Sequence, residues 1–222
     1  NYVQRDIKKA IYYFSLASNQ NVSDAQFKLG NIYFEGKFIP RDIKKAIHYF
    51  SLASNQNNLE AQFNLGSIYF EGIGVPIDIS KSIEYYSLAA KQGHPNAQYN
   101  LGTIYYMGKD IQRDINKAIY YFTLSAKNNV SYAQNKLGFI YMNGIGVPHD
   151  IDKGIYYYKL AAKQNNAAAN YNLGVIYLDG KHLPCDNEKA FHYISLAAKQ
   201  NDAYAQNQLG YFYLVGKIVQ QD

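Results

Sequence analysis

The chain has 222 residues with a formal net charge of +5, and its single cysteine excludes an intrachain disulfide framework. No apolar run reaches the roughly 18 residues that a membrane-spanning helix needs. The N-terminus also lacks the charged, apolar and small-residue succession of a signal peptide. These features predict a cytoplasmic protein without membrane insertion.

The first predicted helix covers residues 6–20, where apolar side chains follow the i, i+3, i+4, i+7 spacing of an amphipathic helix. Asp6 stands where an N-cap side chain accepts from free backbone amides, and Asn21 closes the helix as a left-handed residue. We call this the lysine-side helix. Equivalent start and stop residues recur as Asp42, Asp78, Asp114, Asp150 and Asp186, and as Asn57, Gly93, Asn129, Asn165 and Asn201.

The second predicted helix covers residues 24–35 and ends at Gly36. It contains the pair Leu29-Gly30, and we call it the Leu-Gly helix. A glycine inside a helix costs about 1 kcal/mol relative to alanine. Because the glycine recurs in every copy, at Gly66, Gly102, Gly138, Gly174 and Gly210, we expect a neighbouring helix to approach closely there.

Both helices repeat every 36 residues without an insertion. A period of this length is typical of repeat arrays, in which each helix pair must stack on the next. The sequence therefore predicts an all-α protein: an α/α superhelical solenoid of about six helix pairs, forming one domain over residues 1–222. Apolar loop residues should plug the joints between pairs, at Val3, Ile39, Val75, Ile111, Val147, Leu183 and Val219. Both ends fall inside a repeat, so we expect a truncated array.

The unit A-Q-x-x-L-G-x-x-Y-x-x-G-x-x-V-P-x-D-I-x-K-A-I-x-Y-Y-x-L-A-A-K-Q-G, most complete from Ala61 to Gly93, resembles the Sel1-like repeat, a relative of the tetratricopeptide repeat. The resemblance covers the whole chain. It implies a solenoid that serves as an adaptor or scaffold, with the Leu-Gly helices lining the concave face and the lysine-side helices forming the convex face.

The same resemblance implies which side chains line the concave groove. They lie five and two residues before, and two, five and six residues after, the leucine of each Leu-Gly pair. The partner-binding residues expected on this basis are Phe27, Phe34, Glu35, Glu60, Phe63, Phe70, Glu71, Tyr99, Tyr106, Phe139, Tyr171 and Tyr211. The same positions also include Tyr132 and Tyr204.

Two groups of these aromatic residues have different expectations. Phe27, Phe63, Tyr99 and Tyr171 either line the groove or contact the adjacent repeat. We expect exposure for the other group, which comprises Phe34, Phe70, Tyr106 and Tyr211. Aromatic anchors beside small polar groups are typical of recognition surfaces.

The charge distribution argues against nucleic-acid binding. The Leu-Gly helices carry five acids and two bases, a balance of −3, so a balance of +8 falls on the lysine-side helices and loops. Lysines spread evenly over a convex surface indicate a solvated face more than a phosphate track.

No motif in the sequence indicates catalysis, a cofactor or a metal. His182 and Cys185 share one loop but lack a second ligand pair for zinc. The GIGVP loops at 72–76 and 144–148 do not continue into the G-K-[ST] of a phosphate loop. Glu35 and Glu71 are one repeat apart on the expected groove, where recognition of a basic segment explains them better than acid-base catalysis.

The sequence therefore predicts a non-catalytic scaffold that binds a peptide or a segment of a partner protein in its concave groove. Two alternatives stay open. The chain could be a regulatory or targeting module of a larger enzyme such as a protein kinase, or it could bind nucleic acid through its convex lysines. The sequence does not predict an oligomeric state.

Overall fold

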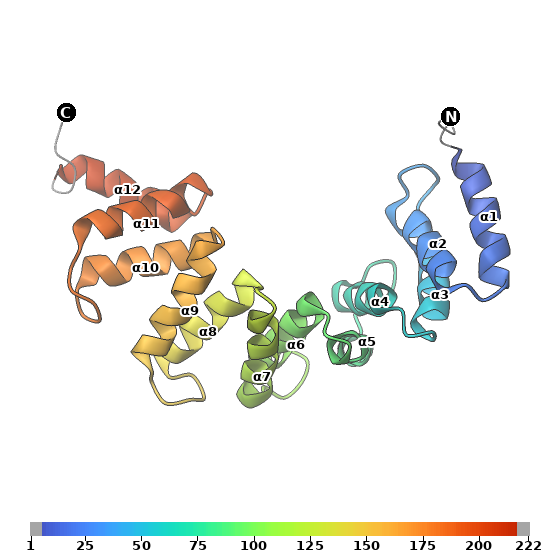
Figure 1. Cartoon of the computed structure of the whole chain (residues 1–222), viewed down its shortest axis with the longest axis horizontal. Helices are drawn as coiled ribbons and strands as arrows, with labels where there is room; N and C mark the ends of the chain where they lie inside the picture. The colour runs from blue at the N-terminus through green and yellow to red at the C-terminus, as the bar shows by residue number, and fades with distance from the viewer. Residues whose placement is uncertain (1–5, 217–222) are drawn as a thin grey trace. The chain divides into compact units, whose positions relative to one another are not determined.

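The computed structural model describes residues 6–216, which form twelve α-helices joined by short loops (Figure 1). The lysine-side helices are α1 (Ile7–Asn19), α3 (Ile43–Ser54), α5 (Ile79–Lys91), α7 (Ile115–Lys127), α9 (Ile151–Lys163) and α11 (Asn187–Lys199). The Leu-Gly helices are α2 (Ser23–Glu35), α4 (Leu59–Glu71), α6 (Pro95–Met107), α8 (Ser131–Asn143), α10 (Ala167–Asp179) and α12 (Ala203–Val215). The predicted all-α class and the alternation of two helix types are confirmed.

The helix ends follow from local capping. The Asp42 side chain accepts from the backbone amide of Lys45 at 3.0 Å, and the equivalent aspartate caps every other lysine-side helix. Asn57 has a φ of 60° at the end of α3, and Gly72 has a φ of 71° at the end of α4. The predicted start and stop residues are therefore confirmed.

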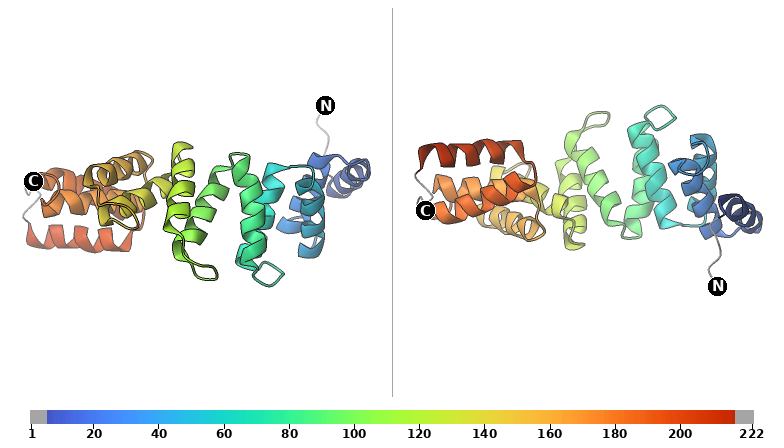
Figure 2. Two further views of the ribbon diagram at one scale, coloured as in Figure 1. Left: turned by 90° about the horizontal axis from the view of Figure 1, so that it is seen from below. Right: turned by 90° about the horizontal axis from the view of Figure 1, so that it is seen from above.

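The Leu-Gly helices α2, α4, α8 and α10 each pack more closely on the lysine-side helix that follows than on the one that precedes. Figure 2 shows one such pair, α4 and α5, side by side in two further views. The recurring glycine makes this possible. Side-chain atoms of the following helix occupy the space that a Cβ would need at five of the six glycines, and they belong to Phe50, Tyr86, Phe122, Tyr158 and Ile194. The predicted close approach is confirmed at those five positions.

The described residues fall into two compact units that divide within α6. The N-terminal unit comprises residues 6–101 and 108–112, and the C-terminal unit comprises residues 102–107 and 113–216. Each unit has its own core, for example Phe50, Leu65 and Ile68 in the first and Tyr158 and Leu173 in the second. None of the helices in residues 6–216 combines the length and hydrophobicity that a membrane span requires.

The loops contribute apolar residues to these cores. Val75 packs against the core of the N-terminal unit and Leu183 against that of the C-terminal unit, as predicted. Val3 and Val219 lie outside the described residues.

Buried glutamines link consecutive repeats. Gln62 donates to the carbonyl of Ser54 at 3.3 Å, and its own oxygen accepts from Gln92 of the next repeat at 2.7 Å. Gln134 forms the same pair of bonds with Ala126 and Gln164. These side chains satisfy buried polar groups that would otherwise be costly to desolvate.

Candidate functional site

Three glutamates of the expected groove are exposed on α2 and α4 of the N-terminal unit. Glu60 lies in the first turn of α4, where the helix dipole favours a negative charge. Glu35 and Glu71 are the last residues of α2 and α4, where the dipole disfavours a negative charge. Helix stability therefore accounts for the charge of Glu60 but does not require those of Glu35 and Glu71.

The aromatic side chains five residues after the leucine are less exposed than expected. Phe34, Phe70 and Tyr106 are all half-buried, so the expectation of exposure is wrong for these three. The ring of Phe34 lies 6.2 Å from that of Phe50, and the guanidinium of Arg41 covers it at 5.1 Å. Phe122 and Arg113 cover the ring of Tyr106 in the same way, at 6.4 Å and 5.2 Å from its centroid.

The residues two positions before the leucine contact neighbouring helices. Phe27 lies 5.9 Å from Phe50, and Phe63 lies 5.8 Å from Tyr86, between ring centroids. In the C-terminal unit, Tyr171 approaches Tyr204 of the next repeat at 6.1 Å. Phe27, Phe63 and Tyr171 were expected either to line the groove or to contact the adjacent repeat, and the contact is observed. These three side chains are half-buried, as is Tyr99.

His94 joins two residues of the expected site and was not singled out from the sequence as part of it. It is buried, stacks on Phe63 with ring centroids 4.3 Å apart, and places Nε2 3.6 Å from Glu60 Oε2. The signal that could have revealed it is its place in the repeat. His94 occupies the N-cap position of α6, where Asn58 and Asn166 cap α4 and α10.

Helix α8 of the C-terminal unit presents two exposed aromatic rings. Tyr132 is 65% exposed and Phe139 is 41% exposed, and their separation of seven residues puts them on one face of the helix. The neighbouring side chain of Asn135 is held by Asn172, whose Nδ2 donates to Asn135 Oδ1 at 3.3 Å. The result is an aromatic stripe with amide groups beside it.

Helix α12 is exposed over a wider area. Tyr211 is 62% exposed, as expected, and Tyr204 is 75% exposed. Tyr213 and Leu214 are exposed as well, although the equivalent residues Tyr177 and Leu178 are covered in α10. Exposure on α12 is less informative than exposure on α8, because no helix follows α12 among the described residues.

The lysine-side helices use their first-turn lysines in a repeated aromatic contact. Tyr141 stacks on Tyr157 with centroids 5.9 Å apart, and Lys153 Nζ lies 4.0 Å from the centroid of the Tyr141 ring. A hydrogen bond with Tyr141 raises the pKa of Lys153, and burial raises the pKa of Tyr157. The same stack with a lysine recurs at Tyr33, Tyr69, Tyr105 and Tyr177.

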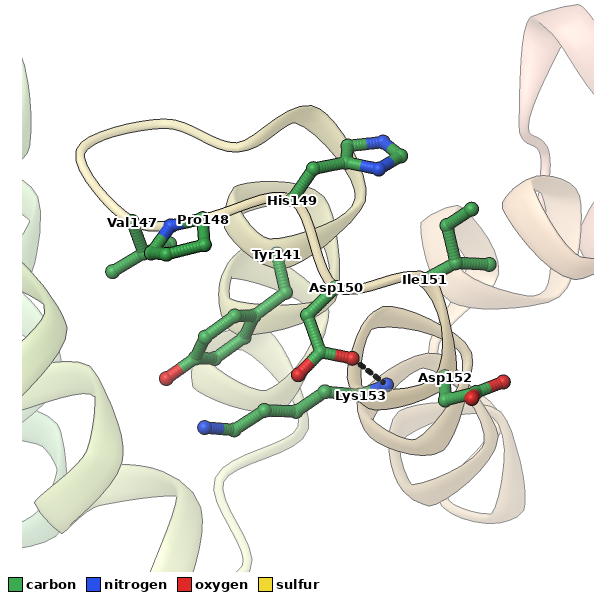
Figure 3. Close-up of a pocket in the computed structure, with 8 residues that line it drawn as sticks. All are labelled: Tyr141, Val147, Pro148, His149, Asp150, Ile151, Asp152 and Lys153. Atoms are coloured by element: carbon green, nitrogen blue, oxygen red, sulfur yellow. Dashed lines mark hydrogen bonds between the residues drawn. The ribbon is translucent and has the colours of Figure 1, made fainter.

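A surface pocket of about 590 Å³ opens beside this contact (Figure 3). Val147, Pro148 and Tyr141 line the pocket. The carboxylate of Asp150 also faces it and accepts a hydrogen bond from the backbone amide of Lys153 at 2.9 Å. His149 points away from Tyr141 and Lys153 in Figure 3. The pocket therefore brings together no nucleophile and base pair of the kind that catalysis needs.

The loop that contains His182 and Cys185 was the one place where the sequence hinted at a metal. In the structure, the exposed Cys185 thiol contacts the carbonyl of Leu178 and the side chain of Asn187, each at 3.6 Å. Within residues 6–216 no three histidine, cysteine, aspartate or glutamate side chains cluster as metal ligands would.

The family model described as Sel1 repeat matches the chain seven times, over residues 1–22, 23–58, 59–94, 95–130, 131–166, 167–202 and 203–222. Each full match begins with a Leu-Gly helix, and no catalytic domain is identified. A search of the curated proteins found no significant match.

Solved structures share the fold. A protective antigen of uropathogenic Escherichia coli strains is 29% identical with a TM-score of 0.90, covering 96% of this chain and 45% of the antigen. The chain thus spans less than half of that protein. A Sel1 repeat protein from Oxalobacter formigenes is 32% identical with a TM-score of 0.82, covering 89% of this chain and 81% of its own.

An immunity protein from Pseudomonas aeruginosa shares the fold at 17% identity and a TM-score of 0.54, covering 90% of this chain and 76% of that protein. The family model spans all 222 residues, and the helix pairs repeat with the period of its matches. The chain therefore belongs to the Sel1 repeat family.

Proposed function

We propose that this chain is a non-catalytic scaffold that binds a segment of a partner protein on the exposed faces of its Leu-Gly helices. Residues 1–222 would act as one repeat domain in the cytoplasm, where Cys185 stays a free thiol. The proposal rests chiefly on one observation, the exposure of Phe139 on α8.

Helix α8 packs against α7 and α9, yet Phe139 remains 41% exposed. The fold does not need an aromatic ring there, because Asn31, Ser67 and Thr103 occupy the equivalent position. Fully burying a phenylalanine is worth about 1.5–3 kcal/mol, and a partner that covers the exposed part of the ring gains the corresponding share. Aromatic residues are enriched in protein interfaces for this reason.

The exposed acids indicate what kind of segment the N-terminal unit would select. A carboxylate at a helix C-terminus opposes the dipole by about 0.3–1 kcal/mol, and Glu35 and Glu71 repeat this placement. Helix α2 also contacts α4. A segment that crosses both helices would therefore meet the two glutamates in succession, which suits a chain with several basic side chains.

The proposal can be tested without knowing the natural partner. A random dodecapeptide library displayed on phage is selected against the chain, and the recovered peptides are measured on Phe139→Ser, on Glu35→Gln with Glu71→Gln, and on the wild type. We expect one group of peptides, rich in lysine and arginine, to lose affinity in the double glutamine variant, and a second group to lose affinity in Phe139→Ser.

A matched control is Tyr156→Ala, which removes a ring that is 57% exposed on the lysine-side helix α9. We expect this variant to bind like the wild type. If all variants are folded by circular dichroism and bind the peptides equally, the exposed faces of the Leu-Gly helices are not the binding site.

A further inference from the structure

His94 is a buried histidine in direct contact with two residues of the proposed binding surface. Its side chain is 7% exposed, between α4 and the N-terminus of α6. The ring lies nearly parallel to that of Phe63, with 13° between the planes. Its Nε2 atom faces the carboxylate of Glu60, whose own side chain is 56% exposed.

The position of the proton on His94 follows from its contact with the backbone. The amide of Ala97 donates to His94 Nδ1 at 3.2 Å. A backbone amide can only donate, so Nδ1 carries no proton in this arrangement and the neutral ring carries its proton on Nε2. The ring thus caps α6 with one nitrogen and points an N–H group at Glu60 with the other.

We infer that His94 is a positioning residue that makes the binding of a basic ligand at Glu60 sensitive to pH; this inference rests on the function proposed above. Neutral His94 caps α6, holds its ring against Phe63 and leaves the charge of Glu60 available to a cationic side chain. In protonated His94, Nδ1 carries a hydrogen and can no longer accept from the Ala97 amide, so the cap of α6 is lost. The positively charged ring also competes with the ligand for the carboxylate of Glu60.

The charged and titratable groups near His94 come from α4 and α5. Glu60 is the carboxylate that α4 brings within ion-pair distance, and Phe63 carries no charge. Helix α5 contributes Tyr86, near Phe63, and Lys91 in its last turn. Burial raises the pKa of Tyr86, so it stays neutral in mildly acidic and neutral solution. The first turn of α6 has no acidic residue.

By linkage, the coupling works in both directions. A cation bound at Glu60 disfavours protonation of His94, and protonation of His94 lowers the affinity for that cation by the same factor. Histidine is the side chain whose charge ordinarily changes between about pH 5 and 8. The acidic surface of the N-terminal unit would therefore hold its ligand in neutral solution and release it on acidification.

The experiment measures binding of a fluorescein-labelled dodecapeptide with arginine at every third position, by fluorescence anisotropy at constant ionic strength. We expect affinity for the wild type to fall about fivefold or more between pH 7.5 and pH 5.5, at the lower end of typical coupling. The same peptide with glutamine in place of arginine should bind weakly at both pH values.

Three variants locate the effect. In His94→Asn the new side chain can cap α6 as Asn58 caps α4, so the fold should be kept and the affinity should become independent of pH. Glu60→Gln should bind weakly at both pH values. His192→Asn removes an exposed histidine in edge contact with Tyr193 and should keep the pH dependence of the wild type.

Each outcome has a defined meaning. A pH dependence that survives in His94→Asn or Glu60→Gln, or that is absent from the wild type while the arginine peptide still binds, overturns this inference alone. Failure of the wild type to bind the arginine peptide at every pH overturns the recognition of basic segments by the Leu-Gly helices, and this inference with it.

Discussion

The ring of Tyr86 occupies the space in which a side chain on Gly66 would begin, with its Cδ1 atom 2.5 Å from the position of a Cβ. The contact joins α4 to α5 and recurs in the other closely packed pairs. It explains why a residue with poor helix propensity stands in the middle of α2, α4, α6, α8 and α10.

The first prediction concerns Gly66→Ala. The added methyl group must displace the Tyr86 ring from a fully packed core, and overpacking of this kind costs about 1–3 kcal/mol. We expect a lower midpoint of urea unfolding, measured by circular dichroism.

Gly210→Ala is the matched control, because within residues 6–216 no atom outside the helix's own backbone lies within 4 Å of a Cβ at Gly210. Alanine should stabilise α12 by about 0.5–1 kcal/mol through helix propensity. If both substitutions shift the midpoint in the same direction, close packing is not the reason for the repeated glycine.

The second prediction concerns Asn170, which replaces glutamine in the fifth repeat. It is fully buried, and neither Oδ1 nor Nδ2 has a hydrogen-bond partner in the described part of the chain. Gln200 turns instead to the carbonyl of Leu196 at 3.1 Å. An unsatisfied buried polar group costs about 1–3 kcal/mol, so Asn170→Gln should raise the free energy of unfolding by on the order of 1 kcal/mol.

The reverse substitution in the preceding repeat is the control for Asn170. Gln134→Asn should break the bonds to Ala126 and Gln164 and lower stability by a similar amount in chemical unfolding. Stabilisation by Gln134→Asn, or destabilisation by Asn170→Gln, would contradict the role given to the buried glutamines.

The third prediction concerns stability at alkaline pH. Burial raises the pKa of Tyr158, so above about pH 10 the unfolded chain loses this proton before the folded chain does. Stability from the neutral phenol is therefore complete below pH 10 and declines as the pH rises further. Tyr158→Phe should reduce this alkaline loss by on the order of 1 kcal/mol, measured as unfolding midpoints between pH 8 and 11.

Phenylalanine is compatible with the packing there, because Phe50 and Phe122 occupy the equivalent position and are fully buried. The exposed Tyr156 provides the comparison, and Tyr156→Phe should leave the alkaline profile unchanged. An alkaline profile of Tyr158→Phe identical to that of the wild type would contradict the prediction.

The fourth prediction separates binding from stability at Phe139. In the second copy, Ser67 holds this position and its hydroxyl lies 3.0 Å from that of Tyr86. The equivalent tyrosine in the fourth copy is Tyr158, so a serine introduced by Phe139→Ser finds a similar neighbour. We expect the thermal midpoint to change little, within about 0.5 kcal/mol of stability.

The pair can be tested with a double-mutant cycle on Phe139→Ser and Tyr158→Phe. A favourable coupling between the introduced serine and Tyr158 should disappear when the hydroxyl is removed. A large loss of stability in Phe139→Ser alone would show that the ring is needed for packing and would remove the main support for its role in binding.

The fold could be predicted from the sequence because the residues that begin and end each helix act locally and recur in every repeat. Asp42 caps a helix with its own side chain, and Gly72 ends one by adopting a left-handed conformation. Neither event depends on distant residues. The period then implied stacking, since a single helix pair cannot bury its apolar face.

The exposure of side chains in the candidate site was decided by the tertiary structure. Phe34 and Phe139 both lie on the Leu-Gly face expected from the repeat, yet Phe34 is covered by Phe50 and Arg41 while Phe139 faces water. His94 meets Glu60 only because α4 packs beside the start of α6. Helix capping depends on residues that are close in the sequence, whereas burial and ion pairing depend on which helices pack together in the folded chain.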